Sequence, residues 1–265
     1  MTTDTPPVRS IFITGAAAGI GREVALRFAA AGWFVGLYDV DETAVRALAG
    51  ALGARSHAAR LDVSRIEDWH AALEAFAPAA QGRLDLLFNN AGIAIAEAFE
   101  DSAVERHCRV IDVNLRGVLN GCHAALPLLR ATPGARIVNM CSASALYGQP
   151  LLATYSATKA AVRSLTEALD IEWQRHGVRV VDVLPLFVNT AMVADEVSKM
   201  KTVQTLGVRL RAEDVARVVW RLAQGRPQRL PVHNAVGWQT WLFYVLGKRV
   251  PDALNRLVTA RMGGF

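Results

Sequence analysis

The stretch from Ser10 to Gly21 reads SIFITGAAAGIG, and it decides the fold. Its first four residues, Ser10–Ile13, are typical of a buried strand, and the segment from Ile20 to Ala31 is typical of a helix closed by Gly32. Between strand and helix, glycines follow the spacing Gly-x-x-x-Gly-x-Gly. Glycines let the backbone approach a pyrophosphate, and the positive end of a helix favours its charge. The stretch therefore predicts the first unit of a nucleotide-binding α/β sheet.

The same alternation of strand and helix continues along the chain. We expect further strands over residues 33–38, up to about 61, 84–88, 136–140 and 178–184, with helices over 42–52, 66–76, 104–129 and 154–175. Such an order predicts an α/β fold: a single doubly wound, Rossmann-type parallel sheet of about seven strands with helices on both faces. No repeat or linker interrupts it, so we expect one domain over residues 1–265, with a loose N-terminal tail over 1–8.

Composition excludes several classes of protein. With 52% hydrophobic and 20% charged residues among 265, the chain is not disordered. The three cysteines, Cys108, Cys122 and Cys141, lack paired spacing, which favours a reducing, cytoplasmic location. The histidines show no metal-ligand spacing, so no metal is expected. No signal peptide and no membrane-spanning run of about 20 apolar residues is visible.

Polar or small residues follow three more of the expected strands. Asp39 ends the second strand, Asp62-Val63 ends the third, and Asn89-Asn90-Ala91-Gly92 follows the fourth. Open α/β sheets bind ligands at the carboxyl ends of their strands. A carboxylate at Asp39 can accept hydrogen bonds from the adenine ribose and would repel a 2′-phosphate. These positions predict NAD as the cofactor.

A second group of residues carries acid–base chemistry. Tyr155 and Lys159 are four residues apart near the start of a helix, so they share one of its faces. A nearby cation stabilises a phenolate and lowers the pKa of the phenol, which makes it a better base. Ser142 lies at the end of a predicted strand, where its hydroxyl could hold a substrate oxygen beside the phenol.

These motifs resemble the short-chain dehydrogenase/reductase family, over about Ser10 to Met192. The cofactor loop Thr14–Gly21 and the turn Asn89–Gly92 both match the family. The resemblance implies a catalytic set of Asn114, Ser142, Tyr155 and Lys159. It also implies that the segment from Pro185 to Thr190 grips the nicotinamide carboxamide, although Leu186 replaces the usual glycine. The expected cofactor-binding residues are Gly15, Gly19, Ile20, Gly21, Asp39, Asp62, Val63, Asn90, Ala91, Gly92, Tyr155, Lys159, Pro185, Val188 and Thr190.

The residues expected around the substrate are mostly apolar. Beside Ile93 and Ala94, the expected substrate pocket consists of Ser142, Leu146, Tyr147, Leu186, Phe187 and Met192. This composition favours a lipophilic alcohol or carbonyl compound over a sugar. The segment 186–211 has no clear period and is a candidate substrate lid.

The last quarter of the chain, including a C-terminal extension over 233–265, has a character of its own. Residues 201–265 carry a net charge of +8, whereas residues 1–200 carry −3. An aromatic run from Trp238 to Leu246 precedes Lys248-Arg249, and Pro251 opens a short amphipathic helix. The aromatic run could close the substrate pocket, pack against another subunit or lie on a membrane surface. No nucleic-acid-binding module is present, and the family resemblance implies a homodimer or homotetramer.

Two functions fit these observations. The first is an NAD-dependent oxidoreductase that moves a hydride between nicotinamide and an alcohol or carbonyl carbon. The second is a non-catalytic regulator that binds a nicotinamide nucleotide with the same fold. The complete set of Asn114, Ser142, Tyr155 and Lys159 favours the enzyme.

Overall fold

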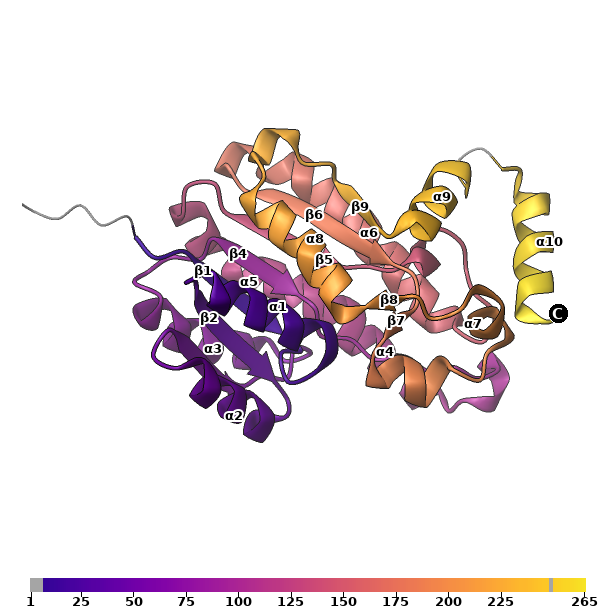
Figure 1. Cartoon of the computed structure of the whole chain (residues 1–265), viewed down its shortest axis with the longest axis horizontal. Coiled ribbons are helices and arrows are strands. Elements are labelled where there is room, and N and C mark those ends of the chain that lie inside the picture. Colours follow the sequence, from indigo (N-terminus) through magenta and orange to yellow (C-terminus); the bar gives the residue numbers. More distant parts are fainter. Residues whose placement is uncertain (1–6, 248–249) are drawn as a thin grey trace, which may run out of the picture.

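The computed structural model describes residues 7–247 and 250–265, so Lys248-Arg249 lies outside the described residues. Seven parallel strands form one sheet in the order β3-β2-β1-β4-β5-β6-β9 (Figure 1). Their bounds are β1 Ser10–Thr14, β2 Phe34–Asp39, β3 Ser56–Arg60, β4 Leu86–Asn89, β5 Arg136–Met140, β6 Arg179–Pro185 and β9 His233–Val236. The strand order reverses direction beside β1, which confirms the predicted doubly wound parallel sheet.

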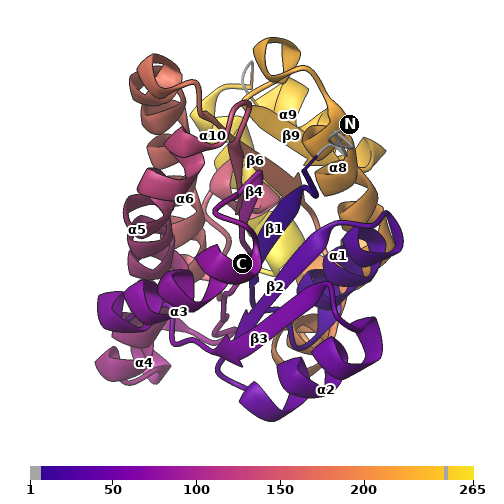
Figure 2. The same cartoon turned by 90° about the vertical axis from the view of Figure 1, so that its left-hand side faces the viewer.

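Helices cover both faces of the sheet (Figure 2). Helices α1, α2 and α8 lie on one side, and α3, α5 and α6 lie on the other. The bounds of the helices are α1 Gly19–Ala30, α2 Glu42–Leu52, α3 Ile66–Ala79, α4 Val104–Ile111, α5 Gly117–Ala131, α6 Ala153–Glu172, α7 Lys201–Leu206, α8 Ala212–Gln224, α9 Trp238–Gly247 and α10 Asp252–Gly263.

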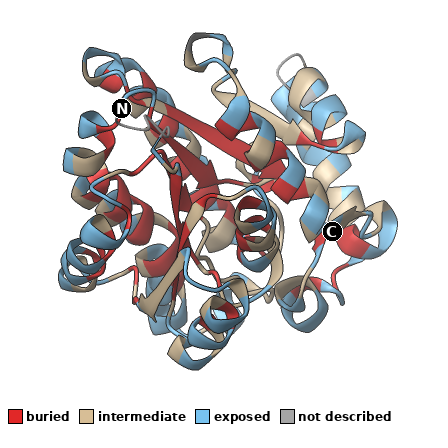
Figure 3. Cartoon of the chain, turned by 60° about the vertical axis from the view of Figure 1, so that its left-hand side comes forward, coloured by how far each residue is buried: buried red, intermediate tan, exposed pale blue. Residues whose placement is uncertain are grey.

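The side chains of β1 divide the core into two layers. Ile11 and Ile13 pack toward α1 and α8, whereas Phe12 packs toward α3 and α5. This alternation follows from the two-residue period of a strand. The ring of Phe12 stacks on Tyr38 with the centroids 3.9 Å apart. Buried residues accordingly concentrate in the sheet and on the inner sides of the helices (Figure 3).

Three features differ from the sequence-based expectations. The helix expected over residues 104–129 is interrupted by a π-turn, Asp112–Arg116, between α4 and α5. Strand β9 and helix α8 were not expected. The segment His233–Val236 holds only four residues and little apolar character, and pairing with β6 makes it a strand. Helix α8 packs its buried face on α1.

A row of polar side chains crosses four adjacent strands, from the last residue of β4 to the first residue of β9. Asn89, Asn139, Asp182 and His233 are paired in register from β4 to β9. Asn89 donates to Asn139 at 2.9 Å, and Asp182 lies 2.8 Å from Nδ1 of His233. Burial raises the pKa of Asp182, although the hydrogen bond and charge of His233 act in the opposite direction. The row ties β9, and with it the start of α9, to the centre of the sheet.

The C-terminal elements stand apart from the sheet. Helix α10 lies at the end of the molecule opposite α2 and α3 (Figure 1), and none of its residues is buried. The segment 186–211, expected to lack regular structure, contains β7 (Val188–Asn189), a π-turn over Val193–Val197, α7 and β8 (Leu210–Arg211). Within the described residues, no helix has both the length and the apolar character needed to cross a bilayer.

Candidate active site

The loop after β1 is shaped by its glycines. Gly15 and Gly19 adopt positive φ angles of 65° and 52°, which favour glycine. A Cβ atom on Gly21 would lie 2.0 Å from the carbonyl oxygen of Gly15, so only glycine fits there. Ala18 caps α1 without a side-chain hydrogen bond. The bare loop and the free N–H groups of the helix leave space and positive charge for the pyrophosphate of a dinucleotide.

Asp39 is held against this loop. One of its carboxylate oxygens accepts a hydrogen bond from the backbone N–H of Ala17 at 3.1 Å, and the other accepts one from Asp41 at 3.1 Å. In the described part of the chain, no lysine or arginine forms an ion pair with Asp39. The carboxylate oxygens therefore have lone pairs left for a further donor, which suits the ribose of the cofactor.

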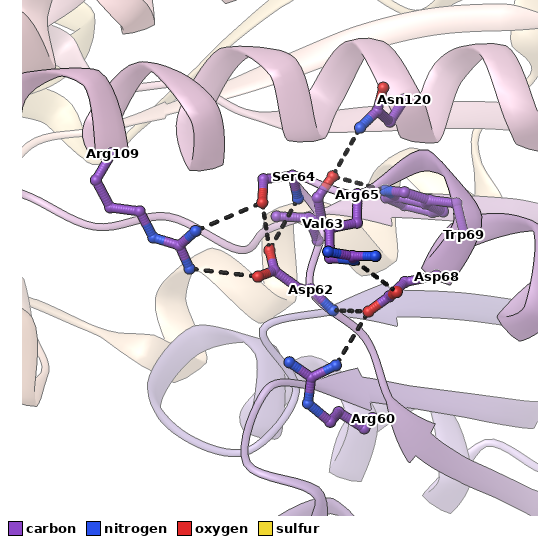
Figure 4. Close-up of polar contacts among 9 residues, drawn as sticks. All are labelled: Arg60, Asp62, Val63, Ser64, Arg65, Asp68, Trp69, Arg109 and Asn120. Atoms are coloured by element: carbon purple, nitrogen blue, oxygen red, sulfur yellow. Dashed lines mark hydrogen bonds and ion pairs between the residues drawn. The ribbon is translucent and has the colours of Figure 1, made fainter. Parts of the chain in front are cut away.

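Asp62 and Val63 sit in a dense polar network (Figure 4). Asp62 accepts hydrogen bonds from the backbone and the hydroxyl of Ser64 at 3.0 and 2.6 Å, and Arg109 of α4 lies 3.5 Å away. Burial raises the pKa of Asp62, but Ser64 and Arg109 outweigh it, so the pKa lies below its usual value. The carbonyl of Val63 accepts from Trp69 and Asn120, both at 3.0 Å. The turn is rigid, with an ionised Asp62.

The turn after β4 fastens the glycine loop to the sheet. The side-chain amide of Asn90 donates to the carbonyls of Thr14 and Gly15, both at 3.0 Å. The hydroxyl of Thr14 accepts the backbone N–H groups of Asn90 and Ala91 at 3.0 and 3.1 Å. A Cβ on Gly15 would meet Ala91 at 2.9 Å. Asn90 thus shapes the loop, and the absence of a side chain at Gly15 lets the two turns approach.

Asn114 lies inside the π-turn, and its side chain explains why the helix is interrupted there. It is fully buried, accepts a hydrogen bond from the backbone N–H of Ile93 at 2.8 Å, and donates to the carbonyl of Ile93 at 2.9 Å. A Cβ on Gly92 would come within 3.2 Å of Asn114 and 3.7 Å of the Lys159 ammonium. The π-turn therefore joins the end of β4 to the region around Lys159.

Lys159 is a buried cation beside Tyr155. Its Nζ donates to the carbonyl of Met140 at 2.9 Å and lies 5.5 Å from the centre of the Tyr155 ring. Burial lowers the pKa of Lys159 to about 8. Burial likewise raises the pKa of Tyr155 to about 12, although a hydrogen bond with Ser142 acts to lower it. The net pKa of Tyr155 is thus raised in the chain by itself, and not lowered as expected, because desolvation is the larger effect.

Cys141 precedes Ser142 but belongs to a different environment. Its thiol is buried and lies 3.2 Å from the carbonyl oxygen of Lys159. Burial raises the pKa of Cys141 to about 12, so it stays a neutral thiol. Ser142 instead accepts a hydrogen bond from the backbone N–H of Ser144 at 3.2 Å and faces the cavity that Tyr155 lines.

The segment after β6 lies against the glycine loop. Val188 is buried in β7, which pairs with β8. A Cβ on Gly19 would lie 3.3 Å from the Thr190 methyl group, so the two turns adjoin. Leu186 needs no positive φ angle, since among the described non-glycine residues only Gln81 and Leu151 have one. Leu186 thus fits the turn after Pro185, where the resemblance implies glycine, and its side chain lines the cavity.

An apolar cavity of about 320 Å³ opens beside Tyr155 and Ser142. Its wall includes seven residues that sequence analysis assigned to the substrate: Ala94, Ser142, Leu146, Tyr147, Leu186, Phe187 and Met192. Ile93 packs against the core instead. The outer wall adds Phe243 and Leu246 of α9, from the aromatic run, and Val258 and Met262 of α10, which sequence analysis missed. The aromatic run therefore does line the cavity, as one of its three interpretations required.

Comparison with known proteins decides the family. The sequence profile of the short chain dehydrogenase family matches residues 9–201. The chain belongs to this family. It is 36% identical over 212 residues to the cyclohexanol dehydrogenase of an Acinetobacter species, covering 78% of this chain and 84% of that protein.

Other similar proteins extend the comparison. An uncharacterized short-chain type dehydrogenase/reductase of Sinorhizobium fredii is 36% identical over 245 residues, or 88% of this chain. The chain spans only 44% of the length of that relative. The crystal structure of a short-chain dehydrogenase/reductase from Burkholderia phymatum in complex with NAD has a TM-score of 0.80 and 28% identity, covering 91% of this chain and 92% of that one. The Rossmann fold is thus shared with an oxidoreductase family, and a neighbour binds a nicotinamide cofactor.

Proposed function

We propose that this chain is an NAD-dependent dehydrogenase that interconverts a lipophilic secondary alcohol and its ketone, with primary alcohols and aldehydes as related substrates. One observation carries the proposal: the Tyr155 phenol and the Ser142 hydroxyl line an apolar cavity, and the buried Lys159 ammonium lies 5.5 Å from the centre of the Tyr155 ring. The similarity to a cyclohexanol dehydrogenase supports a secondary alcohol.

Each residue has a distinct proposed role. When bound, NAD accepts the hydride that leaves the carbinol carbon. Tyr155, as the phenolate, takes the hydroxyl proton of the alcohol, and in the reverse direction it gives that proton to the carbonyl oxygen. Ser142 holds the same oxygen next to Tyr155. Lys159 stabilises the phenolate by its charge, and Asn114 fixes the turn that faces Lys159.

The preference for NAD rests on Asp39. Its carboxylate is anchored by two backbone N–H groups beside the glycine loop. A 2′-phosphate at that point would meet like charge, whereas two ribose hydroxyls would find an acceptor. The bound NAD of the Burkholderia phymatum structure supports this assignment.

The proposal extends to assembly and location. Leu119 of α5 and Ile171 of α6 are 44% and 70% exposed on the same side of the sheet, which supports a homodimer or homotetramer built on these helices. Trp238 and Trp241 of α9 are 66% and 58% exposed and are the surface through which a membrane contact would occur. The free cysteines support a cytoplasmic location.

A spectroscopic assay of NAD reduction over a panel of cyclic and linear secondary alcohols tests the function. We expect turnover, and we expect Tyr155→Phe to reduce kcat by at least about 100-fold. Binding of NAD to Tyr155→Phe should persist, which calorimetry can measure. Calorimetric binding of NAD without turnover of any alcohol or carbonyl compound would favour the regulatory alternative and refute the enzymatic proposal.

A further inference from the structure

Helix α10 has an unusual relation to the rest of the molecule. None of its residues is buried, and its outward residue Leu257 is 62% exposed. Asn255, Thr259 and Met262 are spaced four and three residues apart, so they lie on one face of the helix. All three line the cavity that Tyr155 also lines. The inner face of α10 therefore looks into the substrate space and not into a packed core.

This inner face carries two polar groups. The side-chain amide of Asn255 donates to the carbonyl of Val250 at 3.3 Å, but its oxygen accepts no hydrogen bond within residues 7–247 and 250–265. In the same part of the chain, the hydroxyl of Thr259 has no hydrogen-bond partner. Both side chains are only partly exposed. The oxygen of Asn255 is thus a free hydrogen-bond acceptor facing the cavity, and the hydroxyl of Thr259 can both donate and accept a hydrogen bond there.

The remaining wall between α10 and the catalytic residues is mainly apolar. Leu186, Phe187 and Phe243 lie in it, whereas Ser142 and Tyr155 mark the edge of the sheet. Figure 1 places α10 outermost, beyond α9 and α7. A ligand that fills the cavity thus has one polar end at Tyr155, an apolar middle, and a second polar end at α10.

We propose that α10 recognises the end of the substrate that is remote from the reacting carbon. The substrate class is a rigid, lipophilic alcohol or ketone with a second hydroxyl, which donates to the free oxygen of Asn255 and accepts from the hydroxyl of Thr259. This inference rests on the proposed dehydrogenase function. A partly shielded polar group left unpaired costs more than one in water, so an analogue without the second oxygen is disfavoured.

Matched substrates test the inference. We would compare fused-ring secondary alcohols of two, three and four rings, each with and without a second, terminal hydroxyl. We expect kcat/KM to favour the oxygenated member of at least one pair by roughly tenfold, the product of two hydrogen bonds worth about threefold each. Asn255→Leu and Thr259→Val should each reduce this preference in kcat/KM by about threefold, so that the two together remove it.

The control is Leu257→Ala, on the outward face of the same helix, which should keep the preference. Calorimetric binding of the same pairs to Tyr155→Phe separates this inference from the proposed function. A preference in binding without turnover in the wild type would refute dehydrogenase activity yet uphold recognition by α10. An equal kcat/KM for both members of every pair, or a preference that survives both Asn255→Leu and Thr259→Val, would overturn the inference.

Discussion

The ionisation of Tyr155 gives the sharpest test of the proposed chemistry. In the chain alone, burial raises the pKa of Tyr155 to about 12 and lowers that of Lys159 to about 8. At about pH 8, making phenolate the major form would take roughly 5 kcal/mol, at about 1.4 kcal/mol per pKa unit. The Lys159 ammonium lies 5.5 Å from the ring centre. At that separation and an effective dielectric of about 20, its attraction is about 3 kcal/mol, or roughly two pKa units.

The perturbation is Lys159→Met, measured by kcat/KM for alcohol oxidation at saturating NAD from about pH 6 to about pH 10. Oxidation needs the phenolate, so the wild-type rate should rise about tenfold per pH unit below the working pKa of Tyr155. Without the cation, that pKa should rise by about two units, which lowers oxidation at neutral pH by roughly 100-fold. Carbonyl reduction uses the protonated phenol and should change little between about pH 6 and pH 8.

The control is Lys199→Met, which removes an exposed lysine and should leave the profile unchanged. A uniform fall in rate with an unshifted pH profile for Lys159→Met would refute the reasoning. It would mean that Lys159 acts by holding the cofactor and not through the charge on Tyr155. Ultraviolet difference spectra of wild type and Tyr155→Phe give an independent reading: below about pH 11, the chain without cofactor should show no phenolate from Tyr155.

Three further variants probe the cofactor loop and the cavity wall. Gly21→Ala should raise the Kd for NAD by more than about tenfold, because its Cβ would meet a loop carbonyl at 2.0 Å; titration by calorimetry checks this, and unchanged affinity contradicts it. Asp39→Ser should narrow the ratio of kcat/KM for NAD over NADP by roughly tenfold or more, since like charges about 4 Å apart near a surface cost on the order of 1–4 kcal/mol. Phe243→Ser should raise KM for lipophilic substrates by about threefold to tenfold. This loss corresponds to a fraction of the free energy gained by burying a whole aromatic side chain. Trp241→Ser, on the exposed side of the same helix, should leave that KM unchanged; equal effects of both would contradict the assignment of Phe243 to the cavity.

The fold and the cofactor site follow from sequence to a large extent, for a topological reason. In a parallel sheet, every strand delivers its carboxyl end to the same edge. Placing Asp39, Asp62 and Asn90 after separate strands is therefore enough to predict that they lie along this one edge. Distances within each motif were equally predictable, because four residues on a helix fix the separation of Tyr155 and Lys159.

The features that could not be predicted from the sequence depend on contacts between segments that lie far apart along the chain. The seventh strand has no apolar run of its own; it exists because His233 pairs with Asp182, 51 residues away. The sign of the pKa shift at Tyr155 was missed for a related reason. A neighbouring cation can be inferred from spacing, but the depth of burial that outweighs it is a property of the assembled core.

The outer wall of the cavity shows the same limit most clearly. The run from Trp238 to Leu246 is apolar throughout, so its periodicity could not tell which side chains face inward. The orientation of α9 is set by β9, because the pairing of β9 with β6 places α9 across the opening of the cavity. Phe243 then turns toward the substrate space while Trp241 remains outside. The polar row behind the catalytic edge thus has a functional consequence. By anchoring β9 to the sheet, the pair of Asp182 and His233 fixes where the substrate wall begins.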